Sequence, residues 1–152
     1  YVNNKLCPDN DACMFVTIFC GILDITTGEL QYANAGHNPP LICREDGCEF
    51  LEVSKGMAMG VMEETQFGSD RIVLKPEHSL LLYTDGVTEA MNRDGRQFTP
   101  ERLQEALGRP PSSPDVKEMV QHVKNAVAGF VNEADQSDDL TILALKYHGL
   151  SA

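Results

Sequence analysis

The hydrophobic positions of the first two thirds of the chain follow the spacing of β-strands. A β-branched and aromatic run at residues 14–23 predicts a long buried strand. A turn that ends at Gly28 leads into residues 29–35, which we expect to pair back on that strand. Residues 36–40 contain two prolines and therefore predict a loop. Similar patterns predict further strands at 41–43, 48–53, 66–74, 79–84 and 140–145.

The spacing changes to that of helices towards the C-terminus. Thr99-Pro100-Glu101 is typical of a helix start, and Gly108 of its end. Ser113-Pro114-Asp115 predicts a second start. The helix that follows is expected to span about five turns and to bury a single apolar stripe. That stripe consists of Val116, Met119, Val120, Val123, Val127, Phe130 and Val131. We interpret residues 1–6 as the end of another helix. Strands with helices packed outside them predict an α+β fold.

Composition and charge narrow the class of protein. The 152 residues, 42% of them hydrophobic, suit one globular domain over residues 1–152. The formal net charge of -11 opposes binding to nucleic acid and to anionic membranes. No apolar run is as long as the roughly 20 residues of a membrane span. The charge does permit basic protein partners and divalent cations.

The five cysteines predict free thiols and a cytoplasmic location, because their number is odd and none forms a C-x-x-C pair. Cys43 and Cys48 are a possible exception, since they flank a plausible hairpin loop and could face each other across it. We favour the simpler interpretation, in which both are small apolar strand residues.

Two acidic clusters adjoin the two most apolar late strands. Asp85-Gly86 directly follows residues 80–84, and Asp138-Asp139 directly precedes residues 140–145. If these strands are antiparallel neighbours, the clusters meet at one edge of the sheet. Carboxylates brought together favour a cation between them, and Mg²⁺ or Mn²⁺ would activate a water molecule there. Solvated turns explain the same residues, and both explanations remain open at this point.

The chain resembles the sporulation-stage-II-E and sigma-factor-regulator branch of the bacterial PP2C-type (PPM) metal-dependent serine/threonine phosphatases. The matching segments run in family order across almost the whole chain. They are Met14-Phe15-Val16-Thr17, Gly28-Glu29-Leu30-Gln31-Tyr32-Ala33-Asn34-Ala35-Gly36-His37-Asn38-Pro39-Pro40-Leu41, Gly56-Met57-Ala58-Met59-Gly60, Leu81-Leu82-Tyr83-Thr84-Asp85-Gly86-Val87-Thr88-Glu89-Ala90 and Asp138-Asp139-Leu140-Thr141.

The resemblance implies a sandwich of antiparallel sheets flanked by helices, and a binuclear Mn²⁺ or Mg²⁺ centre. It implies hydrolysis of phosphoserine or phosphothreonine on a regulatory protein, such as a phosphorylated anti-sigma-factor antagonist, in a bacterial signalling pathway. Asp85 and Asp138 match the family's metal aspartates and would carry catalysis. Asp139 would be an alternative ligand or orient water, and Gly86 would allow a close turn. Sensor or receiver domains elsewhere in the parent chain would regulate activity.

The chain departs from the family at its beginning. Nothing before Met14 matches the motifs that supply the aspartate bridging both metals. We therefore expect an N-terminally incomplete domain that lacks its first strands, has an incomplete ligand set, and has little or no activity by itself. Its exposed sheet edge would invite homodimerisation. The alternative function is a degenerate phosphatase fold that acts as a non-catalytic protein-interaction module.

Two further residues have competing interpretations. His37 could protonate a leaving group, but a ring that fixes the proline-rich loop is the preferred role. Glu89 could hold a metal-bound water. We favour an exposed position on a short helix opened by Thr88.

Overall fold

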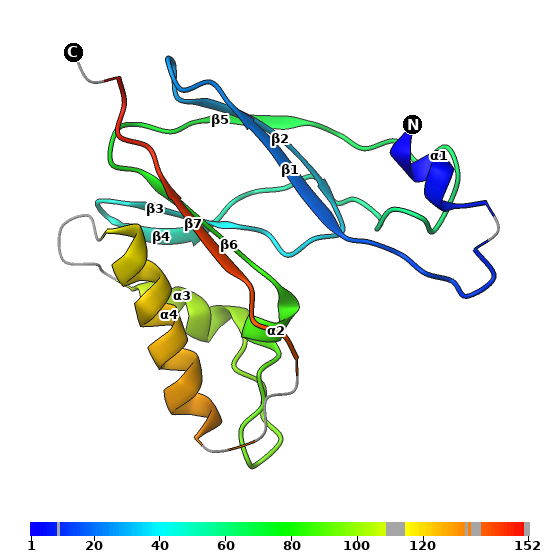
Figure 1. Ribbon diagram of the computed structural model, residues 1–152. Coiled ribbons are helices and arrows are strands. Elements are labelled where there is room, and N and C mark those ends of the chain that lie inside the picture. Colours follow the sequence, from blue (N-terminus) through cyan, green and yellow to red (C-terminus); the bar gives the residue numbers. More distant parts are fainter. Residues whose placement is uncertain (9, 109–114, 133, 135–137, 151–152) are drawn as a thin grey trace. The chain divides into compact units, whose positions relative to one another are not determined.

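The protein is described by a computed structural model that covers residues 1–8, 10–108, 115–132, 134 and 138–150 (Figure 1). The chain divides into two compact units, Tyr1–Pro39 with Glu52–Leu74, and Pro40–Leu51 with Lys75–Ala152. Each unit contains one antiparallel sheet. The predicted α+β class, with antiparallel sheets and accompanying helices, is confirmed. That residues 1–152 form one domain stays a prediction.

The first unit is a three-stranded sheet with a short helix. Its elements are α1 (Val2–Leu6), β1 (Ile18–Leu23), β2 (Glu29–Ala35) and β5 (Asp70–Val73), and the strand order is β1-β2-β5. The turn between β1 and β2 forms because Asp24 Oδ1 accepts the Thr26 backbone N–H at 2.8 Å and Gly28 adopts a φ of 77°. The second predicted strand thus has the expected bounds.

The prediction of a long buried strand at residues 14–23 is wrong in length and in burial. β1 begins at Ile18, and the Val16 segment makes a bridge to Met59 instead. Phe15 and Ile22 are 65% and 72% exposed. The physical reason is position, because β1 lies at the edge of its sheet and pairs with β2 alone among the described strands.

The second unit is a four-stranded sheet covered by helices. Its strands are β3 (Leu41–Arg44), β4 (Gly47–Phe50), β6 (Ser79–Tyr83) and β7 (Ile142–Lys146), in the order β4-β3-β6-β7. Its helices are α2 (Asp85–Thr88), α3 (Pro100–Leu107) and α4 (Val116–Val131). Figure 1 shows α3 and α4 together on one side of this sheet. β6 is a central strand, as its apolar run predicts.

A single hydrophobic cluster joins α3 and α4 to the sheet. Leu81, Leu103 and Val123 are each fully buried in it. Met119, Val123 and Val127 form the buried stripe of α4, and the other four positions of the predicted stripe are half-buried. The two predicted helices are therefore confirmed. The second start motif falls partly on residues 113 and 114, which lie outside the described residues.

β7 was predicted as a buried strand, and this is wrong for half of its residues. Ile142 and Ala144 pack against the core, whereas Leu143 is 59% exposed. Exposed and half-buried residues alternate along β7, so the side chains of one of its faces are exposed in the described part of the chain. In that same part no helix is long and apolar enough to cross a membrane.

The preferred interpretation of Cys43 and Cys48 as free thiols is also wrong. They form a disulfide, with a Cα–Cα distance of 4.0 Å. The cause is register, because they are direct cross-strand partners on either side of the two-residue turn Glu45-Asp46. The other three cysteines are free. The cytoplasmic location, which was argued partly from free thiols, stays a prediction.

Candidate active site

The pairing of β6 with β7 brings the two acidic clusters of the sequence together. The strands are antiparallel, and Tyr83 lies opposite Ile142 in the register. The pairing extends one step further, because the Thr84 N–H donates to the Thr141 carbonyl at 3.1 Å. β6 ends at this point, and Asp85 is the first residue of α2. The start of α2 therefore lies beside the segment that carries Asp138. The predicted antiparallel neighbours are therefore present.

The hydroxyl of Thr84 fastens the two segments to each other. It donates to the Asp139 carbonyl at 3.2 Å and accepts the Thr141 N–H at 3.1 Å. Because a hydroxyl is both a donor and an acceptor, one side chain satisfies two backbone groups on either side of Leu140. The result is a fixed path for the Asp138-Asp139 segment next to the start of α2.

Gly86 lies against the backbone of the second acidic cluster. A Cβ built at this position would be 2.4 Å from the Asp139 carbonyl oxygen and 3.1 Å from its carbonyl carbon. It would also be 3.5 Å from the Asp138 Cβ. No side chain fits at such distances without backbone movement. The close turn predicted for Gly86 has this steric cause.

The three aspartates are exposed, and two of them make local hydrogen bonds. Asp85 Oδ1 accepts the Gly86 N–H at 3.0 Å, and Asp138 Oδ1 accepts the Asp139 N–H at 2.7 Å. Carboxylate oxygens are the ligands that a hard cation such as Mg²⁺ or Mn²⁺ prefers. In the described residues, however, no three His, Cys, Asp or Glu side chains form a group that could hold a metal ion. The described residues thus place Asp85 and Asp138 on neighbouring segments without completing a group of metal ligands.

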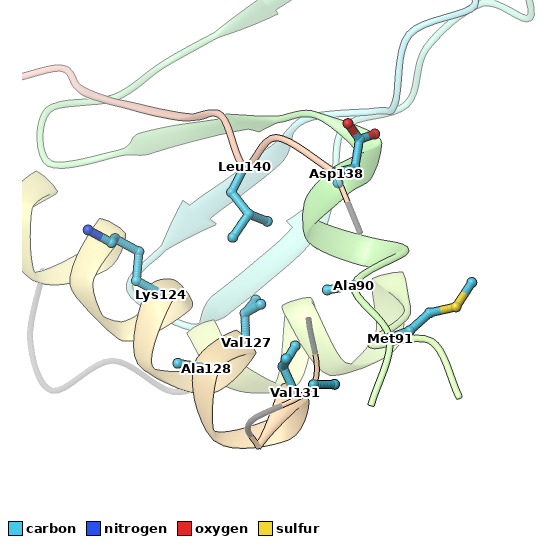
Figure 2. Close-up of a pocket in the computed structure, with 10 residues that line it drawn as sticks. Ala90, Met91, Lys124, Val127, Ala128, Val131, Asp138 and Leu140 are labelled. Carbon is cyan, nitrogen blue, oxygen red and sulfur yellow. The ribbon is translucent and has the colours of Figure 1, made fainter. Parts of the chain in front are cut away.

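An apolar cavity of about 360 Å³ adjoins these acidic segments within the second unit. Gly86 and Asp138 lie on its border, and α4 supplies one wall with Val127, Ala128 and Val131 (Figure 2). The sequence did not single out this cavity, because its lining comes from three separate stretches of the chain.

Polar side chains of residues 34–38 stabilise the loop after β2 in the first unit. Asn34 Oδ1 accepts the His37 N–H at 3.0 Å, and Asn34 Nδ2 donates to the His37 carbonyl at 2.9 Å. His37 Nδ1 lies 2.9 Å from the Asn38 carbonyl oxygen. These contacts match the loop-fixing role preferred for His37. A Cβ at Gly56 would be 2.3 Å from the Asn34 carbonyl oxygen. The segment that begins at Gly56 therefore packs directly on the end of β2.

Glu89 is exposed, as preferred, but Thr88 does not open a helix. Thr84 is the N-cap of α2 and Glu89 is its C-cap, so Thr88 is the last residue of that helix. Val87 and Thr88 are buried, which anchors the turn behind Asp85.

A sequence model of one protein family, described as stage II sporulation protein E (SpoIIE), matches residues 1–148. The chain belongs to the SpoIIE family. This is the family of PP2C-type phosphatase domains whose motifs the sequence resembles, so that prediction is confirmed.

Curated relatives of the SpoIIE-family chain include a phosphatase. Protein IcfG of Synechocystis sp. is 36% identical over 135 residues, which cover 89% of this chain and 21% of that protein. Phosphoserine phosphatase RsbU of Bacillus subtilis is 26% identical over 145 residues, which cover 94% of this chain and 42% of RsbU. The chain thus spans less than half the length of either relative.

The fold matches solved phosphatase domains. The structure of the PP2C phosphatase domain with a fragment of the regulatory domain of SpoIIE from Bacillus subtilis superposes with a TM-score of 0.79. The match covers 95% of this chain and 42% of the other, at 16% sequence identity. At that identity the likeness establishes the fold of the chain, and the chemistry must be argued from its residues.

Sequence reasoning missed one residue of the site, Thr84. Its position directly before Asp85, at the end of an apolar strand, is the sequence feature that could have found it. The partner atoms of its hydroxyl lie 55 and 57 residues away, and only the strand pairing brings them within hydrogen-bonding distance.

Proposed function

We propose that this chain contributes to the hydrolysis of phosphoserine or phosphothreonine on a regulatory protein in a bacterial signalling pathway. A phosphorylated anti-sigma-factor antagonist is the substrate that the family resemblance favours. The observation that carries the proposal is the fastening of the Asp138-Asp139 segment to the start of α2 through Thr84. A fixed spacing between two segments that carry carboxylates supports a shared cation site, because a cation offsets the repulsion between them.

Asp85 and Asp138 would hold Mn²⁺ or Mg²⁺ through their carboxylate oxygens. Asp139 is the alternative ligand or orients water beside it. When bound, the metal supplies an acidified water and neutralises charge on the phosphate. The chain's own part is to fix the ligand segments: Thr84 sets their spacing, and Gly86 lets the backbones touch.

We expect the ligand set of the active phosphatase to be larger than Asp85, Asp138 and Asp139. The family's bridging aspartate has no counterpart in residues 1–13, so we expect this chain to bind metal weakly and to turn over phosphopeptides slowly or not at all. The whole protein would be active, under the control of sensor or receiver domains outside this stretch. The exposed apolar side chains at β1 and β7 support a homodimer formed through a sheet edge.

Calorimetric titration with Mn²⁺ tests the role of the two aspartates. The protein encoded by the full gene and this chain are titrated side by side, each as wild type, Asp85→Asn and Asp138→Asn. We expect either substitution to remove measurable Mn²⁺ binding. Asp94→Asn serves as the matched control, because Asp94 is an exposed carboxylate in a turn between Met91 and Gln97.

Thr84 provides a second, independent check. Thr84→Val keeps the shape but removes the hydroxyl, so Mn²⁺ affinity and phosphate release from a phosphoserine peptide should both fall. Thr84→Ser keeps the hydroxyl and should restore both. Unchanged Mn²⁺ affinity in Asp85→Asn would overturn the proposed function.

A further inference from the structure

The cavity beside the acidic segments is apolar and open at the surface. Its walls come from α4, from the residues after α2 and from the segment before β7, and Ala90, Val127 and Leu140 are among them. Its volume of about 360 Å³ lies at the small end of ligand pockets, and suits one or two apolar side chains rather than a whole cofactor. Asp138, a proposed metal ligand, lines this cavity, and so does Gly86, which directly follows the other proposed ligand, so the two sites are continuous.

The two charged residues of the cavity stand at opposite sides of it. Lys124, Val127, Ala128 and Val131 follow one another at helical spacing and therefore share one face of α4. Figure 2 shows Lys124 on one side of the apolar side chains and Asp138 on the other. The chain has a net charge of -11 and repels carboxylates over most of its surface, whereas the ammonium group of Lys124 attracts them.

We infer that this cavity binds the apolar side chain beside the phosphoserine of an acidic substrate segment, and that Lys124 pairs with an acidic residue of that segment. The inference rests on the proposed function, since it places the phosphoserine at the Asp138 side. Two observations select this occupant. The cavity is continuous with the proposed site, and Lys124, the cationic residue among the described residues that line it, lies on the side away from Asp138.

The occupant has a definite chemistry. Its phosphate lies at the acidic segments, where a divalent cation would compensate the charge. An aliphatic side chain such as leucine then fills the space over Val127 and Ala128, which removes apolar surface from water. A carboxylate further along the segment reaches Lys124, which is exposed and loses little hydration on pairing.

The test measures the affinity of synthetic peptides for the protein encoded by the full gene, in Mn²⁺, by fluorescence anisotropy. Each fluorescein-labelled ten-residue peptide carries a phosphonate analogue of phosphoserine, so that binding is measured without turnover. Each of two reference peptides carries leucine next to the analogue and glutamate three positions beyond the leucine. In one peptide these residues lie on the N-terminal side of the analogue, and in the other they lie on the C-terminal side. Comparison peptides replace the leucine by alanine or the glutamate by lysine.

The protein variants test the two ends of the cavity separately. Ala128→Leu fills the cavity from an exposed helical position that tolerates leucine. Gly129→Leu is its matched control, because a Cβ at Gly129 meets no atom within 4 Å and this residue does not line the cavity. Lys124→Glu reverses the charge at the far side.

We expect the reference peptide to bind about tenfold more tightly than its alanine counterpart in one chain direction. Ala128→Leu should abolish this difference, and Gly129→Leu should retain it. Lys124→Glu should weaken the glutamate peptide and strengthen the lysine peptide. Equal affinity of the leucine and alanine peptides, or an Ala128→Leu protein that still distinguishes them, would overturn the inference.

Phosphate release from the corresponding phosphoserine peptides separates this inference from the proposed function. No release from any peptide, with the expected pattern of affinities, would contradict the proposed function and support the peptide site. If phosphate is released at equal rates from the leucine and alanine peptides, and the two peptides bind with equal affinity, the proposed function is supported and the peptide site is overturned.

Discussion

A side chain at Gly86 would collide with the backbone of the second acidic segment. The methyl group of Gly86→Ala would approach the Asp139 carbonyl oxygen to 2.4 Å, and neither segment has a flexible side chain there to give way. We expect the free energy of unfolding to fall by about 1–3 kcal/mol, as for other overpacked sites. Denaturant unfolding measures the change.

The control for that substitution lies on α4. Gly129→Ala adds a methyl group where no atom lies within 4 Å, and should raise the free energy of unfolding by roughly 0.5–1 kcal/mol through helix propensity. A Gly86→Ala protein as stable as Gly129→Ala would show that the backbones of the two acidic segments do not touch in solution.

We expect His78 to make the stability of the second unit depend on pH. Burial lowers its pKa, and Arg44 and Lys75 lower it further. The Lys75 N–H donates to His78 Nδ1 at 3.3 Å, which requires the neutral ring. Because the unfolded chain takes up the proton first, stability should be complete above the usual histidine pKa of about 6.5 and fall as pH drops below it.

Unfolding midpoints measured between pH 5 and pH 8 test this prediction. His78→Gln should flatten the part of the pH dependence between the folded-state pKa of His78 and about pH 6.5. His122→Gln, at an exposed position on α4, is the matched control and should leave the slope unchanged. A slope that is the same in wild type and His78→Gln would contradict the assignment.

At the scale of elements, a disulfide links the two strands of the β3–β4 hairpin, and the hairpin contacts α3. Cys43 is buried in the core cluster, and Gln104 Nε2 donates to the Cys48 carbonyl at 2.9 Å. The covalent link closes a loop with a sequence separation of 5, so its reduction should cost about 2 kcal/mol of unfolding free energy on the chain-entropy account.

Unfolding with and without reducing agent measures that contribution. The double variant Cys43→Ala/Cys48→Ala should be insensitive to the reducing agent, whereas Cys20→Ser, which removes an exposed free thiol, should respond like wild type. The prediction is wrong if wild type is equally stable in both conditions while mass spectrometry shows the disulfide reduced.

The sequence predicted the buried face of the long helix α4 correctly, but it did not predict the burial of the outer strands. The spacing of Met119, Val123 and Val127 fixed both the helix and its buried face, because a helix that covers a sheet must present one apolar stripe. Apolar runs at β1 and β7 predicted strands but not their burial. An edge strand and a central strand carry similar residues, and the difference lies in which neighbours pair with them.

At the scale of the whole molecule, apolar side chains are exposed along the outer strands of both sheets. Ile22 of β1 and Val73 of β5 are 72% and 58% exposed, and Leu143 of β7 is 59% exposed. Such edges favour association between copies, whereas the net charge of -11 opposes it. We expect self-association that increases with protein concentration and with salt, which screens the charge.

Light scattering across a range of protein and NaCl concentrations tests this expectation. Ile22→Lys and Leu143→Lys should each lower the fraction of dimer if the strand they occupy is the interface. Thr26→Lys, an equally exposed change in the turn after β1, controls for the added positive charge. A monomeric mass at high protein concentration and high salt would contradict the dimer.

The sequence by itself determined the α+β class, the order of most elements, the phosphatase family and the acidic residues of the proposed site. These follow from local periodicity, turn chemistry and motifs. The tertiary structure decided which strands are edges, that Cys43 faces Cys48, and that Thr84 fastens the Asp138-Asp139 segment beside Asp85. Each of these depends on register between residues apart in sequence, and a one-dimensional pattern does not encode that register.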